Sequence, residues 1–191
     1  MADRVCAELD GLQRIQTKTI MHTTHFIEKK GPPVRIHCYV DNQRLVNTVL
    51  DYAPVFEAYI EADPISASTA ETLLNWLYQF SRKKKSSPFP IELLALDQVS
   101  PFRKEVFATL CKIPFGQVAS YGEVAQKIGN EKASRAVGSA CGRNPFPLIV
   151  PCHRVIAGDG SAGGFSLDFR IKRDLLAFEA SASAKTHTQT T

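Results

Sequence analysis

A cysteine, a histidine and an arginine follow one another in the last third of the chain, at Cys152, His153 and Arg154. The apolar run at 148–150 comes just before them, and prolines stand on both sides of that run. Such a run predicts a short buried strand, whose ends proline would set because it fixes φ and cannot donate to a ladder. A thiol is nucleophilic as the thiolate, which a nearby base or cation favours. The pattern therefore predicts a positioned, activated cysteine, with a buried structural cysteine as the alternative.

Short motifs around the cysteine are more specific than the cysteine itself. The chain reads Gly-Arg-Asn-Pro at 142–145, Pro-Cys-His-Arg at 151–154 and Gly-Gly-Phe-Ser at 163–166. With these motifs, the second half of the chain, from about Ser100 to Glu179, closely resembles the O6-alkylguanine-DNA alkyltransferases. The resemblance implies direct-reversal DNA repair, in which duplex DNA carrying O6-alkylguanine is bound, the damaged base is flipped out, and its alkyl group moves to Cys152. The product would be a thioether, which offers water no carbonyl to attack, so each molecule should act once.

The resemblance also implies roles for residues near the cysteine. His153 would act as the base, through a water molecule, and Glu179 would orient its imidazole. Asn144 would connect the DNA-binding helices to the active-site turn, and Arg154 would brace that turn. Tyr121 would lie beside the flipped nucleotide and donate a proton to the guanine leaving group, on which negative charge builds up. Without the resemblance, Glu179 would be read as an exposed helix-end carboxylate and Tyr121 as a half-buried aromatic residue.

Mostly small side chains surround one long cation, Arg135, between residues 133 and 141. They let a helix backbone approach a surface closely, although a helix packed on a neighbour, with Arg135 in solvent, would show the same pattern. The resemblance implies that this helix enters the minor groove and that Arg135 replaces the flipped base in the stack. Extrusion costs a few kcal/mol, and contacts that avoid base edges make binding nearly independent of sequence. The expected DNA-binding residues are Tyr121, Ala133, Ser134, Arg135, Ala136 and Gly138.

The pocket for the base is expected between the active-site turn and the loop at 162–166. By resemblance, the Val155 carbonyl would accept from the exocyclic amine of guanine, and Ser166 would bond the alkylated O6. The family often has tyrosine in place of Phe165 and smaller residues around Leu167. We therefore predict a narrower pocket, which accepts a methyl adduct more readily than a benzyl adduct.

Helices must position these residues. Ser100-Pro101 is typical of a helix start, and Pro-Phe-Gly at 114–116 would end that helix. A capping box at 120–123 predicts a second helix that runs to residue 129. A third helix is expected from about 131 to 141, capped by Asn130 and stopped by Gly142. Two short helices joined by a Gly-Asn turn predict a helix-turn-helix.

The first half shows no chemistry of its own. Apolar and polar residues alternate at 34–40, which predicts a strand. A capping box at 68–71 predicts a helix to about Phe80, and 91–96 is predicted as another strand. The basic run at 82–85 is read as a solvated helix end, with a phosphate-binding or nuclear-import patch as the alternative. The spacing of His22, His25, His37 and Cys38 is too loose for a zinc motif, so no metal site is expected.

Composition and charge bound the class of protein. The 191 residues are 44% hydrophobic and 22% charged, with a net charge of +4, which fits a globular protein that can bind nucleic acid without a strong basic excess. No signal peptide is expected, and no apolar run reaches membrane-spanning length. Five scattered cysteines make a poor disulfide framework and favour a reducing, cytoplasmic setting.

The expected architecture has two domains. An α/β N-terminal domain covers 1–95. A mostly α C-terminal domain covers 96–180 and carries a winged-type helix-turn-helix and an active-site Pro-Cys-His-Arg turn. Residues 181–191 form a disordered tail. The protein is expected to act on double-stranded DNA as a monomer, without a cofactor and away from membranes.

Two other functions remain open from the sequence. A damage sensor would bind the same DNA without transfer, although such alkyltransferase-like sensors lack the acceptor cysteine that this chain has. A thiol hydrolase would need a histidine from elsewhere in the chain and an oxyanion hole, and would leave the helix-turn-helix without a role. A methyl group on Cys152 after exposure to damaged DNA would separate the three functions.

Overall fold

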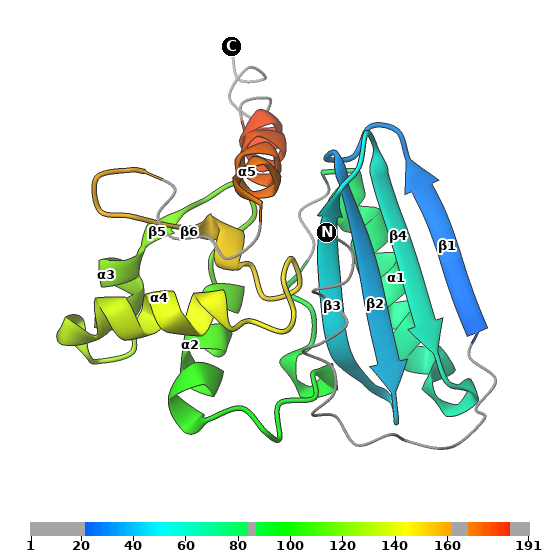
Figure 1. Cartoon of the computed structure of the whole chain (residues 1–191), viewed down its shortest axis with the longest axis horizontal. Coiled ribbons are helices and arrows are strands. Elements are labelled where there is room, and N and C mark those ends of the chain that lie inside the picture. Colours follow the sequence, from blue (N-terminus) through cyan, green and yellow to red (C-terminus); the bar gives the residue numbers. More distant parts are fainter. Residues whose placement is uncertain (1–21, 84–86, 162–167, 184–191) are drawn as a thin grey trace, which may run out of the picture.

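A mixed β-sheet with one long helix stands beside a group of helices in the computed structural model (Figure 1), which describes residues 22–83, 87–161 and 168–183. The first half of the chain forms the sheet and the second half forms the helical group. This division agrees with the expected α/β and mostly helical halves. Within the described residues, none of the helices is long and apolar enough to cross a membrane.

Four strands form the sheet in the order β1-β4-β2-β3. They are β1 (His22–Glu28), β2 (Val34–Asp41), β3 (Arg44–Tyr52) and β4 (Phe56–Ala62). Strands β2 and β4 are parallel, whereas the other two pairs are antiparallel. The alternation predicted at 34–40 is confirmed, because every second side chain of β2 is fully buried. Asn42 and Gln43, with φ of 50° and 63°, close the tight β2–β3 hairpin.

Helix α1 (Ala67–Ser81) packs on the sheet, mainly through β4. It ends at Ser81, next to the predicted end at Phe80. The capping box predicted at 68–71 is wrong. A 3-10 turn, η2 (Pro64–Ser66), leads into the helix, and α1 is already helical at Ala67. The hydroxyl of Ser66 accepts the Gln43 N–H at 2.8 Å. A tertiary hydrogen bond to the hairpin therefore decides where this helix begins.

The strand predicted at 91–96 is also wrong. Residues Ile91–Leu93 form a 3-10 turn, η3, and Leu94 makes an isolated bridge with Leu45 of β3. A short apolar run indicates burial but does not distinguish between backbone conformations. Here Pro88 and Pro90, just before this run, have no N–H groups to donate to a neighbouring strand.

The second half contains α2 (Pro101–Cys111), α3 (Tyr121–Lys127), α4 (Ser134–Gly142) and α5 (Phe169–Ser183). Helix α2 begins after Ser100 as predicted and ends before the Pro-Phe-Gly stretch. The capping box of α3 is confirmed, since the Glu123 N–H donates to the Ser120 hydroxyl and the Ser120 N–H donates to the Glu123 carboxylate, at 3.1 and 2.6 Å. The third predicted helix begins as a 3-10 turn, η4 (Glu131–Ala133), and Gly142 is its last helical residue.

Two short strands fix the entrance to α3. Strand β5 (Ala119–Ser120) pairs in parallel with β6 (Val155–Ile156), with Ala119 opposite Val155. The chain enters α3 directly after β5, and β6 follows the Pro-Cys-His-Arg segment. This pairing therefore holds the start of α3 beside the segment that carries Cys152.

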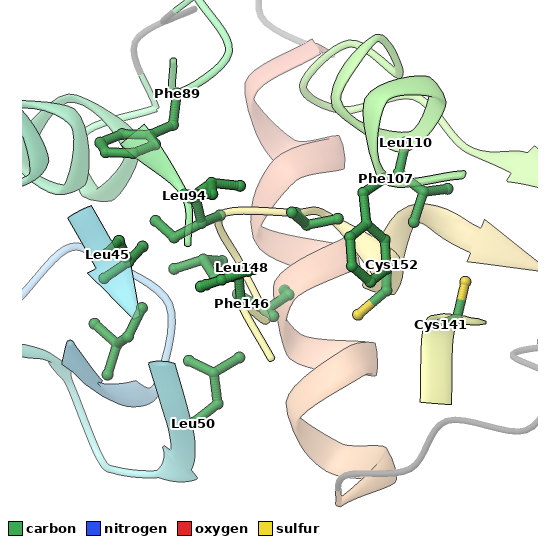
Figure 2. Close-up of a cluster of buried hydrophobic side chains, with 14 of the residues drawn as sticks. Leu45, Leu50, Phe89, Leu94, Phe107, Leu110, Cys141, Phe146, Leu148 and Cys152 are labelled. Atoms are coloured by element: carbon green, nitrogen blue, oxygen red, sulfur yellow. The ribbon is translucent and has the colours of Figure 1, made fainter. Parts of the chain in front are cut away.

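A continuous apolar core joins the two halves. The ring of Phe80 in α1 lies 5.7 Å from those of both Phe115 and Phe178, measured between ring centroids. Figure 2 shows Leu45 of β3 close to Phe146 and Leu148, which precede Cys152 in sequence. The domain boundary at 95/96 stays a prediction, but packing does not separate the halves there.

Candidate functional site

Cys152 lies in a 3-10 turn, η5 (Cys152–Arg154), and is 5% exposed. The run at 148–150 is buried as predicted, but the predicted strand is wrong. It forms a turn in which Leu148 has φ of 75° and an isolated bridge joins Pro147 to Val150. The prolines that were expected to frame a strand instead remove the N–H groups that a ladder needs. A left-handed leucine costs about 1–2 kcal/mol, which the surrounding contacts must offset.

Asn144 holds this turn from the side of α4. Its Oδ1 accepts the Phe146 N–H at 3.0 Å, and its Nδ2 donates to the Val150 carbonyl at 2.9 Å. The same Nδ2 lies 3.3 Å from the Cys152 sulfur and donates to it. Asn144 thus contacts the start of the turn, its end and the thiol, from a position two residues beyond the end of α4.

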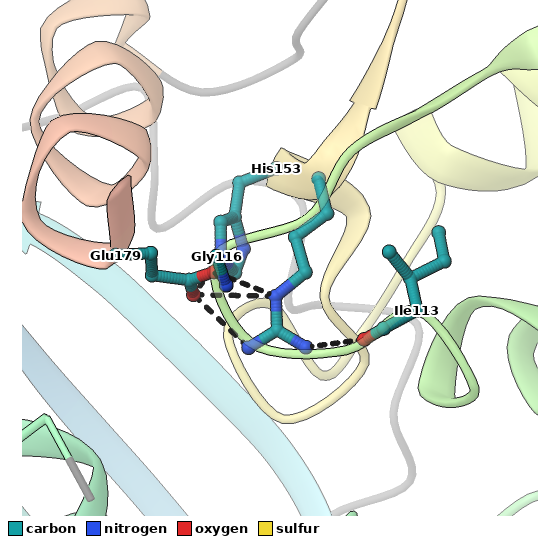
Figure 3. Close-up of polar contacts among 5 residues, drawn as sticks. Ile113, Gly116, His153 and Glu179 are labelled. Atoms are coloured by element: carbon teal, nitrogen blue, oxygen red, sulfur yellow. Dashed lines mark hydrogen bonds and ion pairs between the residues drawn. The ribbon is translucent and has the colours of Figure 1, made fainter. Parts of the chain in front are cut away.

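Glu179 of α5 is the centre of a buried polar network (Figure 3). His153 Nε2 lies 2.9 Å from its Oε1, and Arg154 donates to both carboxylate oxygens through Nε and Nη2. The Gly116 N–H donates to Oε2 at 2.9 Å. Arg154 Nη1 also donates to the Ile113 carbonyl at 2.8 Å, so Arg154 braces the turn against the end of α2. Glu179 is 1% exposed rather than an exposed helix-end carboxylate.

The network determines which ring nitrogen of His153 carries the proton. Burial lowers the pKa of His153, and the contact with Glu179 opposes this effect in part. Burial alone would raise the pKa of Glu179, but His153 and Arg154 together lower it to about 2. At neutral pH the carboxylate is therefore ionised and the imidazole neutral. Because a carboxylate accepts and does not donate, Nε2 carries the proton and Nδ1 bears the free lone pair. Nδ1 is buried and has no hydrogen-bond partner among the described residues.

Cys152 keeps its proton in this environment. Burial raises its pKa, while the hydrogen bond from Asn144 and the charge of Lys172 lower it. The net direction is upward, so the group is a thiol at neutral pH. A nucleophilic thiolate then has to form by proton removal at the time of reaction.

Lys172 of α5 is a site residue that sequence reasoning missed. It is fully buried, and its Nζ donates to the Val155 carbonyl at 2.6 Å. Burial lowers the pKa of Lys172, which Cys152 and Cys141 oppose. Helical spacing offered a signal, because Lys172, Leu175 and Glu179 follow one another at the i, i+3, i+7 positions of one helix face.

A groove of about 590 Å³ runs between the start of α3, α4 and the turn after β6. The ring of Tyr121 lines this groove and would be 3.8 Å from a Cβ placed on Gly138. Burial raises the pKa of Tyr121, so its phenol stays protonated. Arg135 and Ala136 are exposed on α4. The lining residues are Ser120, Tyr121, Gly122, Ser134, Arg135, Gly138, Ala157 and Gly158.

Some predicted site residues lie elsewhere. Ala133 is buried in η4, at 8% exposure, and its role in DNA binding stays a prediction. Val155 is buried, and its carbonyl accepts a hydrogen bond from Lys172, so its role toward guanine stays a prediction. Phe165, Ser166 and Leu167 lie outside the described residues, and their roles stay predictions.

The histidines of the first half do not gather around a common point. His25 and His37 stack on opposite sides of the Tyr59 ring, at 4.2 and 4.6 Å between centroids. Cys38 points into the core, whereas the neighbouring His37 points to the other face of the sheet. Across the part of the chain that the structure describes, no three potential metal ligands come together.

Comparison with known proteins addresses the same region. A family model described as "6-O-methylguanine DNA methyltransferase, DNA binding domain" matches residues 101–181. The methylated-DNA–protein-cysteine methyltransferase of Methanosarcina acetivorans is 51% identical over 80 residues, covering 42% of this chain and 51% of that protein. The inducible enzyme of that name from Bacillus subtilis is 41% identical over 103 residues, covering 54% and 55%. The chain therefore spans about half the length of these curated relatives.

A likeness over most of the chain comes from solved structures. Mycobacterium tuberculosis OGT in complex with DNA is 30% identical, with a TM-score of 0.55, over 78% of this chain and 94% of that chain. The chain belongs to the O6-methylguanine-DNA methyltransferase family. In this methyltransferase-family member the matched region contains Cys152, His153, Glu179, Asn144 and Arg135. The sheet of the first half lies outside the family model, whereas a structural match over 78% of this chain extends beyond the second half into the first.

Proposed function

We propose that the protein repairs DNA by moving a methyl group from O6-methylguanine to Cys152. The observation that carries this proposal is the arrangement of the thiol. The Cys152 sulfur accepts a hydrogen bond from Asn144. The next residue, His153, is a neutral imidazole whose Nε2 is hydrogen-bonded to the ionised carboxylate of Glu179. The partner is double-stranded DNA that contains an O6-alkylated guanine.

Helices α3 and α4 would bind the duplex as a helix-turn-helix of the winged type. The exposed side chains of α4 are small apart from Arg135, so its backbone can enter the minor groove without reading base edges. A thiol inside the protein cannot reach a stacked base, and the damaged nucleotide must therefore be flipped out. Arg135, which lines the groove, would fill the vacated position in the stack and offset part of the unstacking cost.

The transfer itself is an in-line displacement at the methyl carbon. His153 Nδ1 removes the thiol proton, through a water molecule, and the sulfur attacks the methyl carbon. The carbon–O6 bond breaks as the sulfur–carbon bond forms, and its electron pair stays on the guanine. The Tyr121 phenol supplies a proton to this developing anion. The products are an unmodified guanine and S-methylcysteine, a thioether that water does not cleave, so one protein repairs one lesion.

Intact-mass measurement with peptide mapping tests this proposal. The protein is mixed with duplex DNA carrying a single O6-methylguanine, and a Cys152→Ser variant serves as the control. One added methyl group on Cys152, saturating at one per protein, would support stoichiometric transfer. Binding of the same DNA with Cys152 unmodified would instead favour a damage sensor, and repeated turnover of an acyl substrate would favour a thiol hydrolase.

Adduct preference is tested in the same assay. Leu167 stands where the family often has smaller residues. We therefore propose that the protein reacts more slowly with O6-benzylguanine than with O6-methylguanine. Comparable rate constants for the two adducts would contradict the narrow pocket and leave the transfer reaction itself untouched.

A further inference from the structure

The outer edge of β3 forms hydrogen bonds with later segments of the chain. One side of β3 pairs with β2, and the other side faces the helical group (Figure 1). On that side the Leu45 carbonyl accepts the Ala95 N–H at 2.9 Å, and the Thr48 N–H donates to the Pro145 carbonyl at 2.9 Å. The segment that leads to Cys152 is therefore docked against the edge of the sheet.

This segment is poor in hydrogen-bond donors. Residues 145–151 include three prolines, none of which has an N–H. The carbonyls of Pro145 and Pro147 still need partners, because Pro147 is buried and Pro145 is half-buried. Thr48 provides both, through its N–H to Pro145 and through its hydroxyl to Pro147 at 3.0 Å. Thr48 is itself 3% exposed, so water does not readily replace these bonds.

The two carbonyls lie where the turn is most constrained. Pro147 immediately precedes Leu148, whose φ is 75°. On the other side, Asn144 binds Phe146, Val150 and the Cys152 sulfur. The turn is thus held by Asn144 from α4 and by Thr48 from β3. A loosened turn would let Cys152 shift relative to the groove, and displacement at carbon is sensitive to misplacement of about 1 Å.

We propose that Thr48 is a positioning residue for alkyl transfer, through which the sheet of the first half fixes the turn that carries Cys152. This inference rests on the proposed function and deepens it, because it assigns a part in the reaction to a half of the chain that shows no chemistry in its sequence. Thr48 touches neither DNA nor the reacting atoms. It acts on the turn, and the turn acts on the thiol.

The test compares Thr48→Val with Thr48→Ser in single-turnover methyl transfer at saturating duplex. Valine keeps the shape and the N–H bond to Pro145 but removes the hydroxyl, whereas serine keeps the hydroxyl. We expect the rate constant of the valine variant to fall roughly tenfold, with an unchanged Kd for DNA, and the serine variant to react within about twofold of the wild type. Equal rate constants for the valine variant and the wild type would overturn the inference.

Two control variants separate positioning from stability. Val49→Ala changes an exposed side chain on the same strand, and Leu73→Ala opens a cavity in the core under α1. Both should transfer at the wild-type rate constant, although Leu73→Ala lowers the melting temperature. A proportional loss of rate and melting temperature across all variants would show that Thr48 acts through stability alone and would overturn the proposal.

Hydrogen exchange at the Val150 amide gives a readout that does not depend on transfer. This N–H donates to the Phe146 carbonyl within the turn, at 2.8 Å. It should exchange faster in Thr48→Val than in the wild type or in Thr48→Ser. Unchanged exchange would refute the anchoring of the turn even if the protein transferred no methyl group. Absence of transfer in the wild type would refute the proposed function instead.

Discussion

At the scale of single residues, Glu179 is the hydrogen-bond acceptor that three groups of the site share. It accepts from His153, from Arg154 and from the Gly116 N–H, all in a buried environment. Each of these groups would be costly to bury alone, because an unpaired charge or donor loses its hydration. The carboxylate therefore fixes the imidazole tautomer and neutralises a buried guanidinium at once.

Replacing this carboxylate should destabilise the protein strongly. Glu179→Gln keeps the shape but leaves Arg154 buried without a counter-charge, and we expect the free energy of unfolding to fall by about 3–5 kcal/mol. Urea denaturation measures this value, and Glu105→Gln on the exposed side of α2 is the matched control. A loss below 1 kcal/mol would mean that the ion pair contributes little to stability.

The pKa of Glu179 also predicts how stability depends on pH. The carboxylate titrates near 4.5 when unfolded and near 2 when folded, so its contribution is complete above pH 4.5 and lost as pH falls towards 2. The wild type should lose about 3 kcal/mol more than Glu179→Gln over that interval. Denaturation of both proteins from pH 6 to pH 2.5 checks this, and parallel curves would exclude Glu179 as the cause.

The protonation state of His153 should set the pH dependence of methyl transfer. Its pKa is lowered by burial, against the opposing effect of Glu179, so the neutral base persists below pH 6.5. The single-turnover rate constant should be level from pH 8 to about 6.5 and fall only at lower pH, as the imidazole takes up a proton. An inflection near the pKa of a free thiol would show instead that Cys152 ionises without this base.

At the scale of elements, the proposed approach of DNA to α4 depends on the small side chains of this helix. Gly138 faces the Tyr121 ring across the groove, and the neighbouring Arg135 is exposed at the rim. The capping box of α3 and the β5–β6 pair hold Tyr121 against this helix. A close approach of DNA requires that no bulky side chain stand at position 138.

Added bulk in the groove should weaken DNA binding without unfolding the helix. Gly138→Val fills the space against Tyr121, and we expect the Kd for duplex DNA to rise about tenfold or more. Ser139→Val is the control, because Ser139 is exposed on the same helix and does not line the groove. Fluorescence anisotropy compares the two, and equal affinities would place DNA elsewhere on the surface.

At the scale of the whole molecule, the two halves share one core. Phe80 packs against Phe115 and Phe178, and Thr48 bonds to the segment before Cys152. The site is assembled from α2, α4, α5 and the active-site turn, with the sheet behind that turn. Breaking the contact between the halves would expose apolar surface on both, which couples their stabilities.

This coupling predicts a single unfolding transition. Trp76 in α1 is the one tryptophan of the chain and stacks on Phe80 at 5.6 Å, so its fluorescence reports on the first half. Far-UV circular dichroism reports largely on the helices of the second half. The two signals should change at the same urea concentration, and separate midpoints would show two independently folding domains.

The sequence by itself determined the local features. The alternation of β2, the start of α2 and the capping box of α3 depend on neighbours within a few residues, and all three are confirmed. The motifs around Cys152 also sufficed to indicate the family. These signals are local because hydrogen bonding in a cap, or burial of one strand face, is set by residue types at fixed short spacing.

Tertiary structure decided the rest. The run at 148–150 is a turn held by side chains outside it, since Asn144 donates to the Val150 carbonyl and Thr48 donates to the Pro147 carbonyl just before the run. Helix α1 is helical already at Ala67 because Ser66 binds the β2–β3 hairpin. The packing of α5 against the active-site turn made Lys172 a site residue, and it buries Glu179, which the resemblance had named but the residue pattern alone would have left exposed. Each of these outcomes depends on a partner 6 to 99 positions away along the chain. Burial makes such contacts strong, and a linear pattern contains no record of which distant groups it brings together.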